Sequence, residues 1–187
     1  MDHYNMLVVK RDGRTENVSF DKIFKRIEDL AKVPGFELSS NLNIHTVCKK
    51  TIELMTESIA TETLDKLSAN ICGDLITTNY DYNRLGARIL ISNLLKNLKA
   101  RDKVNTFSEL TKLINERVPN YLNQKYVTFV KHNASKLDVM INNNYNYLFD
   151  FFGFKTLENA YLIKDNAKKE TLETPQALWM RVAIAIH

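Results

Sequence analysis

The sequence has few of the residues that interrupt regular structure or crosslink a chain. Among its 187 residues are only five glycines, three prolines and two cysteines. So few glycines and prolines are typical of a mostly helical chain with short connections. Cys48 and Cys72 are not part of a Cys-x-x-Cys pair, which excludes a dense disulfide framework and a zinc ribbon.

Long apolar runs and a strong excess of one charge are missing too. No stretch of about 18 apolar residues occurs, and the N-terminus lacks a basic segment followed by an apolar block, so we predict neither a membrane span nor a secretory signal. The net charge is only +4 and the basic residues are dispersed, which argues against a nucleic-acid surface. With 44% hydrophobic residues, the chain can bury a core, and we expect a globular, cytoplasmic protein.

The patterns of common catalytic sites are absent as well. There is no glycine-rich dinucleotide or phosphate loop, no Gly-x-Ser-x-Gly and no His-Glu-x-x-His. The four histidines are isolated from one another, and Cys48 and Cys72 each fall in the apolar stripe of an expected helix, where cysteine usually packs as a small apolar residue. We therefore predict no catalytic residue and no metal site in this chain.

A hairpin is the first structural signal. Residues 6–10 and 15–19 are short runs with β-branched residues, and between them Asp12-Gly13 tolerates the backbone angles of a tight turn. Ser19 or Asp21 can then cap a helix.

Amphipathic helices account for the remainder of the first hundred residues. Apolar side chains recur every three to four positions in four segments. We expect the first helix near residue 20, a second over 44–57, a third with Thr61 as its N-cap and a fourth from Asp81.

A charged link at residues 96–104 suggests a domain boundary between residues 97 and 98. Beyond it, the pattern predicts helices over 107–117 and 121–141, a loop over 142–146, and an aromatic cluster entering a helix around 156–162. A last helix begins at Thr174-Pro175 and is apolar around most of its circumference. Such a helix belongs inside a larger body, so we interpret the sequence as the N-terminal piece of a longer protein.

The hairpin and the helix after it gather positive charge. The N–H groups at a helix start form an anion site, and Lys10, Arg11 and Lys22 would add three cations near it. This arrangement suits the phosphates of a nucleotide. The alternative is a solvated hairpin whose basic residues only keep an edge strand soluble.

These same residues resemble the opening of an ATP-cone, a nucleotide-binding regulatory domain. The likeness rests on Val8, Lys10, Arg11, Asp12, Gly13, Arg14, Glu16, Val18, Phe20, Asp21, Lys22 and Ile23. It continues in Thr61-Glu62-Thr63-Leu64-Asp65 and in the segment from Asp81 to Lys96.

The second half resembles the segment that follows the cone in large subunits of eukaryotic-type class I ribonucleotide reductases. The likeness rests on residues 152–158, Tyr161-Leu162, Pro175-Gln176 and residues 180–183, whereas residues 100–145 are only loosely similar. The implied fold is mainly α with a small β-hairpin. An ATP-cone of one hairpin and about four helices would fill residues 1–97, and residues 98–187 would be an incomplete helical segment that normally leads into a ten-stranded α/β barrel.

The resemblance implies a specific function. The family reduces ribonucleoside diphosphates to deoxyribonucleoside diphosphates with a thiyl radical, which a separate small subunit generates. Its cone binds ATP as activator or dATP as inhibitor, with Mg²⁺ and no covalently bound cofactor, and its occupancy controls the association of large subunits. By position, the site would consist of Lys10, Arg11, Glu16, Asn17, Val18, Ser19, Phe20, Asp21, Lys22, Thr61, Asp65 and Lys96.

Roles for these residues follow from the same resemblance. Lys10, Lys22 and Lys96 would neutralise phosphates, and backbone groups around 16–18 would contact the adenine edge. Thr61 and Asp65, one helical turn apart, could contact the sugar. The catalytic cysteines of the family lie beyond position 187, and Cys48 and Cys72 match none of them, so we predict an oxidoreductase part that is inactive alone.

Two alternatives stay open at this stage. One is a stand-alone ATP-cone regulatory protein, although a repressor of that kind would carry a zinc ribbon, which the missing Cys-x-x-Cys pairs argue against. The other is a split or inactive nucleotide-binding fragment that assembles with a second polypeptide.

Overall fold

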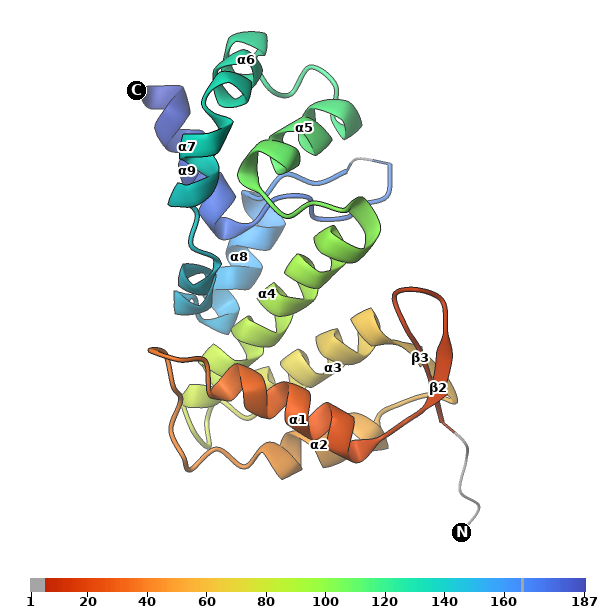
Figure 1. The fold of residues 1–187 in the computed structure, drawn as a ribbon. Coiled ribbons are helices and arrows are strands. Elements are labelled where there is room, and N and C mark those ends of the chain that lie inside the picture. Colours follow the sequence, from red (N-terminus) through yellow and green to blue (C-terminus); the bar gives the residue numbers. More distant parts are fainter. Residues whose placement is uncertain (1–5, 166) are drawn as a thin grey trace. The chain divides into compact units, whose positions relative to one another are not determined.

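The computed structural model describes residues 6–165 and 167–187, and these residues fall into two compact units (Figure 1). The first unit comprises the chain up to Asn93 together with Tyr147–Phe154, and the second comprises Leu94–Asn146 and Lys155–His187. Helices predominate, which confirms the predicted fold class. The domain boundary between residues 97 and 98 stays a prediction. No helix of the described residues is long and apolar enough to cross a membrane.

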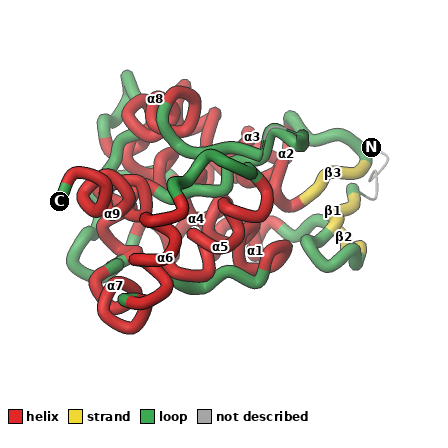
Figure 2. The backbone as a smooth tube through the Cα atoms, turned by 90° about the horizontal axis from the view of Figure 1, so that it is seen from above, coloured by secondary structure: helices red, strands yellow, loops and turns green. Residues whose placement is uncertain are grey.

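A small sheet opens the first unit (Figure 2). It consists of β1 (Leu7–Val9), β2 (Thr15–Asn17) and β3 (Ser58–Ala60), in the order β2-β1-β3. β1 and β2 form the predicted antiparallel hairpin, and Gly13 in its turn has a φ of +85°, which favours glycine. β3 pairs in parallel with β1 and was not predicted, because its partner lies about fifty residues earlier in the chain and no tight turn joins the two strands.

Four helices make up most of the first unit. They are α1 (Phe20–Ala31), α2 (Ile44–Glu53), α3 (Thr61–Asp74) and the first part of α4 (Asp81–Asp102). α1 begins as predicted, with Ser19 as the N-cap: the Lys22 N–H donates to Ser19 Oγ at 3.3 Å. α2 ends four residues earlier than the predicted 57, because the chain turns there to enter β3.

The start of α3 differs from the prediction. Ala60 holds the N-cap position, and Thr61 is the first helical residue. The Thr61 hydroxyl donates to the carbonyl of Val9 at 3.0 Å, so it joins the helix to β1 instead of capping the helix. Sequence spacing could not show this, because the contact depends on the unpredicted strand β3.

The core of the first unit contains Phe151, whose ring lies against two helical glycines. A Cβ on Gly73 would meet the ring at 2.9 Å, and one on Gly86 would meet it at 3.0 Å, so only glycine leaves room for the ring there. The N–H of Phe151 donates to Asn83 Oδ1 at 3.0 Å. These contacts fasten a segment from the second half of the sequence to α3 and α4.

The second unit consists of helices and the loops between them. Its elements are the end of α4, α5 (Phe107–Arg117), α6 (Gln124–His132), α7 (Ala134–Met140), most of the 3₁₀ helix η1 (Asn143–Leu148), the end of α8 (Phe151–Ala160) and α9 (Pro175–Ile186).

The structure confirms the predicted helix over 107–117 and corrects its neighbours. The predicted charged link is helical as far as Asp102. The single helix expected over 121–141 is two helices that meet at Asn133, whose side chain donates to the Phe129 carbonyl at 2.9 Å. The expected loop at 142–146 is mostly 3₁₀ helix, and α8 begins at Phe151, before the predicted residue 156.

The final helix begins as predicted, with Thr174 as N-cap and Pro175 at the first helical position. Glu173, 1% exposed, accepts two bonds from Arg181, at 2.7 and 3.1 Å, and this fork holds α9 to the loop before it. Farther along, Trp179 and Ile186 are 53% and 73% exposed. In the second unit, then, only part of this apolar helix is buried.

Candidate nucleotide-binding site

A pocket of the first unit lies between the hairpin, α1 and α3. Its apolar side chains come from all three: Val8, Ile23, Ile27 and Leu64. Six of the residues predicted from the sequence line it: Lys10, Glu16, Ser19, Lys22, Thr61 and Asp65. Their spacing explains the convergence, because residues three and four apart share one face of a helix, as the N-cap Ser19 and the α1 residues Lys22 and Arg26 do.

Two lysines meet at one carboxylate in this pocket. Lys10 Nζ lies 2.6 Å from Glu16 Oε1, across the hairpin, and Lys22 Nζ lies 3.0 Å from Glu16 Oε2. The bond from Lys10, and then that from Lys22, holds the pKa of Glu16 below its usual value. All three side chains are at least one-third exposed, so the ammonium groups are accessible to an anion from solvent.

A second, more buried carboxylate is held by two arginines. Asp65 is 5% exposed and accepts bonds from Arg26 at 2.8 and 2.9 Å and from Arg11 at 3.2 Å. Arg11 also donates to Asn93, and Arg26 lies 3.4 Å from Ser92 Oγ. Asp65 thus connects the hairpin turn with α1 and α3, and the arginines extend the network to α4.

The strand register determines which backbone groups at the hairpin edge can meet a ligand. The Val18 N–H donates to the Met6 carbonyl at 2.9 Å, and the Lys10 N–H donates to the Arg14 carbonyl at 2.7 Å. In an antiparallel pair such bonding alternates along the strand, so the N–H and C=O of Asn17 point away from β1. Of the backbone groups predicted at 16–18, those of Asn17 are therefore the ones that the pairing with β1 does not use.

Other predicted site residues do not line the pocket. Arg11 bonds to the pocket residue Asp65 without lining the pocket itself, and Asn17 and Asp21 are exposed. Phe20 stacks with Phe24 and His45, at ring-centroid distances of 6.2 and 5.6 Å.

The last two of the predicted site residues also lie outside the pocket lining. Val18 is tied to Met6 through its backbone, and Lys96 is an exposed residue of α4 in the second unit. Their assignment to the site stays a prediction.

Sequence reasoning missed two polar residues of the pocket. Arg26 and Ser68 both line it. A signal existed for each: Arg26 follows Lys22 by four residues on α1, and Ser68 follows Asp65 by three on α3. Each therefore shares a helical face with a residue that was chosen.

The cysteines pack in the core, as predicted. Cys48 and Cys72 are both 0% exposed. Burial raises the pKa of Cys48 to about 11 and also raises the pKa of Cys72. A thiol in such surroundings is a poor nucleophile. No group of His, Cys, Asp and Glu that could hold a metal ion occurs among residues 6–165 and 167–187.

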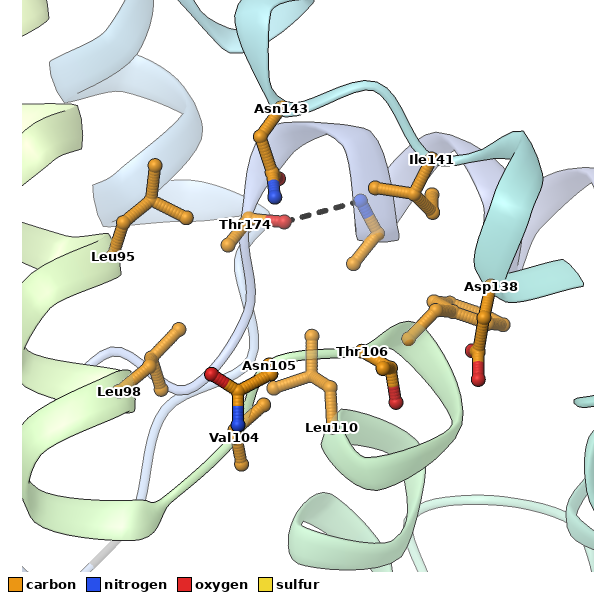
Figure 3. A pocket seen from close by; sticks show the side chains of 12 residues that line it. Leu95, Leu98, Val104, Asn105, Thr106, Leu110, Asp138, Ile141, Asn143 and Thr174 are labelled. Atoms are coloured by element: carbon orange, nitrogen blue, oxygen red, sulfur yellow. Dashed lines mark hydrogen bonds between the residues drawn. The ribbon is translucent and has the colours of Figure 1, made fainter.

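The second unit has a pocket of different chemistry (Figure 3). Leu95, Leu98 and Leu110 project into it, and the lining also contains the polar residues Asn105, Thr106, Asn143 and Thr174. Asp138 is the charged side chain in the lining, and it accepts bonds from the N–H and hydroxyl of Ser108 at 2.8 and 2.7 Å. Without a basic residue in its lining, this pocket does not suit a phosphate.

Two parts of the chain match known protein domains. Residues 6–97 match the ATP cone domain, and residues 147–187 match the ribonucleotide reductase all-alpha domain. Residues 6–97 therefore belong to the ATP cone family of domains, which implies that they bind a nucleotide effector.

Similar proteins extend this assignment to the whole chain. The chain is 37% identical to the ribonucleoside-diphosphate reductase large subunit of Caenorhabditis elegans over 196 residues, which cover 100% of this chain and 24% of the relative. The corresponding subunits of Dictyostelium discoideum and Monkeypox virus are 37% and 36% identical, over 97% of this chain and 21% and 23% of their own length. The chain thus corresponds to an ATP cone and the N-terminal region of such large subunits, and it spans about a quarter of their length.

Proposed function

We propose that the pocket between the hairpin, α1 and α3 binds ATP or dATP, with Mg²⁺ on the phosphates, as an allosteric effector. One observation carries the proposal: Lys10 and Lys22, whose ammonium groups are accessible from solvent, converge on a single pocket within the domain that matches the ATP cone. Charge-assisted bonds from such cations are the strong contacts to phosphate.

The ligand-free contacts suggest how phosphates would enter. Lys10 and Lys22 are both engaged by Glu16, which acts as an internal anion between them. A triphosphate carries more negative charge than one carboxylate, so it would draw the two ammonium groups away from Glu16. The lysines are brought together before the ligand binds, which lowers the cost of ordering them.

The base and the sugar would occupy the other sides of the pocket. The outward backbone groups of Asn17 would contact the adenine edge. Thr61 and Asp65 lie one turn apart on α3 in the pocket lining, where they would contact the sugar hydroxyls. In this proposal, Lys96 adds a further phosphate contact.

We further propose that residues 1–97 are the regulatory domain, and residues 98–187 an incomplete segment of the catalytic domain, of a cytoplasmic ribonucleoside-diphosphate reductase. The whole enzyme would reduce ribonucleoside diphosphates with a radical supplied by a small subunit, and nucleotide binding would control the association of its large subunits. The relatives' names and the two domain matches support this.

This chain alone would not catalyse the reduction. Its two thiols are buried and have raised pKa values, so neither suits redox or radical chemistry. Deoxynucleotide formation by the chain with a small subunit, a dithiol and a nucleoside diphosphate, if it were lost on substitution of Cys48 or Cys72, would contradict this.

Calorimetry on the chain tests the nucleotide assignment. ATP and dATP should bind, whereas GTP and dTTP should bind weakly or not at all, because a base edge read by fixed backbone groups discriminates between bases. Equal affinity for GTP would refute the adenine assignment.

A further inference from the structure

Arg26 holds Asp65 in one orientation. Arg26 Nε donates to Asp65 Oδ1 at 2.8 Å, and Nη2 donates to Oδ2 at 2.9 Å. Two parallel bonds between a planar guanidinium and a carboxylate fix the plane of both groups. Both terminal nitrogens of Arg26 also lie 3.4 Å from Ser92 Oγ, so the arginine is itself supported from α4.

The burial of Asp65 makes this support necessary. The residue is 5% exposed, and a buried carboxylate is costly unless it is paired. Its other partner, Arg11, comes from the hairpin turn and supplies a bond at 3.2 Å. Without the fork from α1, the carboxylate could rotate toward Arg11 and would no longer present a fixed acceptor to the pocket.

We propose that Arg26 is a positioning residue for Asp65, through which it determines how strongly the pocket discriminates between nucleotides that differ in their sugar hydroxyls. The inference rests on the proposed function, in which Asp65 contacts the sugar. A site built to bond a hydroxyl rejects the analogue that lacks it, because its own polar group is then left unpaired. Such rejection requires an acceptor that cannot reorient. Lysine would preserve the charge of Arg26 but not the fork.

The test combines altered ligands with altered protein. We would measure Kd by calorimetry for ATP, 2′-deoxy-ATP, 3′-deoxy-ATP and ADP with the unaltered chain, Arg26→Lys and Lys22→Ala. In the unaltered chain, loss of the sugar hydroxyl that donates a hydrogen bond to Asp65 should weaken binding about tenfold or more. In Arg26→Lys this penalty should shrink to about threefold or less, while the ratio of ADP to ATP affinity stays unchanged. Lys22→Ala should show the reverse pattern.

Several results would overturn the inference. Arg26→Lys could weaken all four ligands by one factor, or leave the hydroxyl penalty intact, and either outcome would show that the arginine does not set sugar specificity. A chain that binds ATP without any hydroxyl preference would also overturn it, yet would leave the proposed function standing. Failure of the proposed function looks different: the unaltered chain would then bind none of the four ligands.

A second variant guards against misfolding of Arg26→Lys. Ser92→Ala removes the hydroxyl that supports Arg26 but retains the ion pair with Asp65. It should reduce the hydroxyl penalty in the same direction and by less. An unchanged penalty in Ser92→Ala, with an unfolded Arg26→Lys, would count against the inference.

Discussion

The pockets of the two units use charge in opposite ways. In the first unit, the cations Lys10, Lys22 and Arg26 line the cavity together with the carboxylates Glu16 and Asp65. In the second, the pocket lining has one charged side chain, Asp138. Arg181 lies outside that pocket and forms an ion pair with the buried Glu173.

The ion pairs of the two units differ in what they do: those of the first pocket hold cations where a ligand can reach them, and the pair in the second unit stabilises the fold. The bonds of Lys10 and Lys22 to Glu16 are partly exposed and can be exchanged for bonds to a ligand. In the fork between Glu173 and Arg181, the glutamate side chain is buried. Removing the arginine would therefore leave the Glu173 carboxylate buried without an ion-pair partner. Basic residues therefore indicate a binding site where they line an open cavity, and not merely where they are paired.

The largest effect is expected from Arg181→Ala. Removing one partner of a buried pair costs about 3–5 kcal/mol, so this variant should strongly destabilise the second unit. Hydrogen exchange should show α9 losing protection while α1 and α3 keep theirs. The exposed pair of Lys112 and Glu116 offers a control, since Lys112→Ala should cost at most about 1 kcal/mol. Equal losses from both variants would contradict the distinction between the two kinds of pair.

An intermediate effect is expected from Lys10→Ala and from Lys22→Ala. Each removes a charge-assisted bond to phosphate and should weaken ATP binding by about 1–3 kcal/mol, or roughly 5–150-fold. Calorimetry measures it, with Asp138→Asn as the matched control from the other pocket. An unchanged affinity in Lys10→Ala would remove this residue from the site.

The smallest effect concerns Glu16 and pH. Its pKa is lowered in the folded protein, so its contribution to stability is present above the ordinary glutamate pKa of about 4.3 and is lost as the pH falls through the lowered folded value. Thermal unfolding should therefore show the unaltered chain more stable than Glu16→Gln at neutral pH, and the gap should close at low pH. A gap that is constant with pH would show that the two lysines do not stabilise the ionised carboxylate.

Local sequence patterns sufficed for much of the first unit. The hairpin, the Ser19 cap and the helical faces of α1 and α3 follow from spacing within a few residues. Charge pattern alone indicated Lys10 and Lys22 in the pocket, whereas Glu16, Ser19, Thr61 and Asp65 were predicted from the family resemblance. Strand β3 could not be predicted in this way, because it exists only through its pairing with β1, about fifty residues earlier in the chain.

The rest of the site depends on contacts that are distant in sequence. Arg26 donates to Asp65, which is 39 residues away in the sequence, and Arg11 donates to Asn93, which is 82 residues away. The helix boundaries in the second half of the chain could not be predicted from the sequence either. The break at Asn133 interrupts a helical pattern that continues on both sides. A periodic pattern shows where a helix can form, but tertiary contacts determine where it ends.

The central claim is that the cations of the first pocket receive a nucleotide, and amide NMR spectra of the labelled chain test it most directly. On addition of ATP and Mg²⁺, we predict shifts at Lys10, Lys22 and Thr61, with no change at Asn105 or Asp138 around the other pocket. Shifts confined to the second pocket, or spectra that ATP leaves unchanged, would contradict the account.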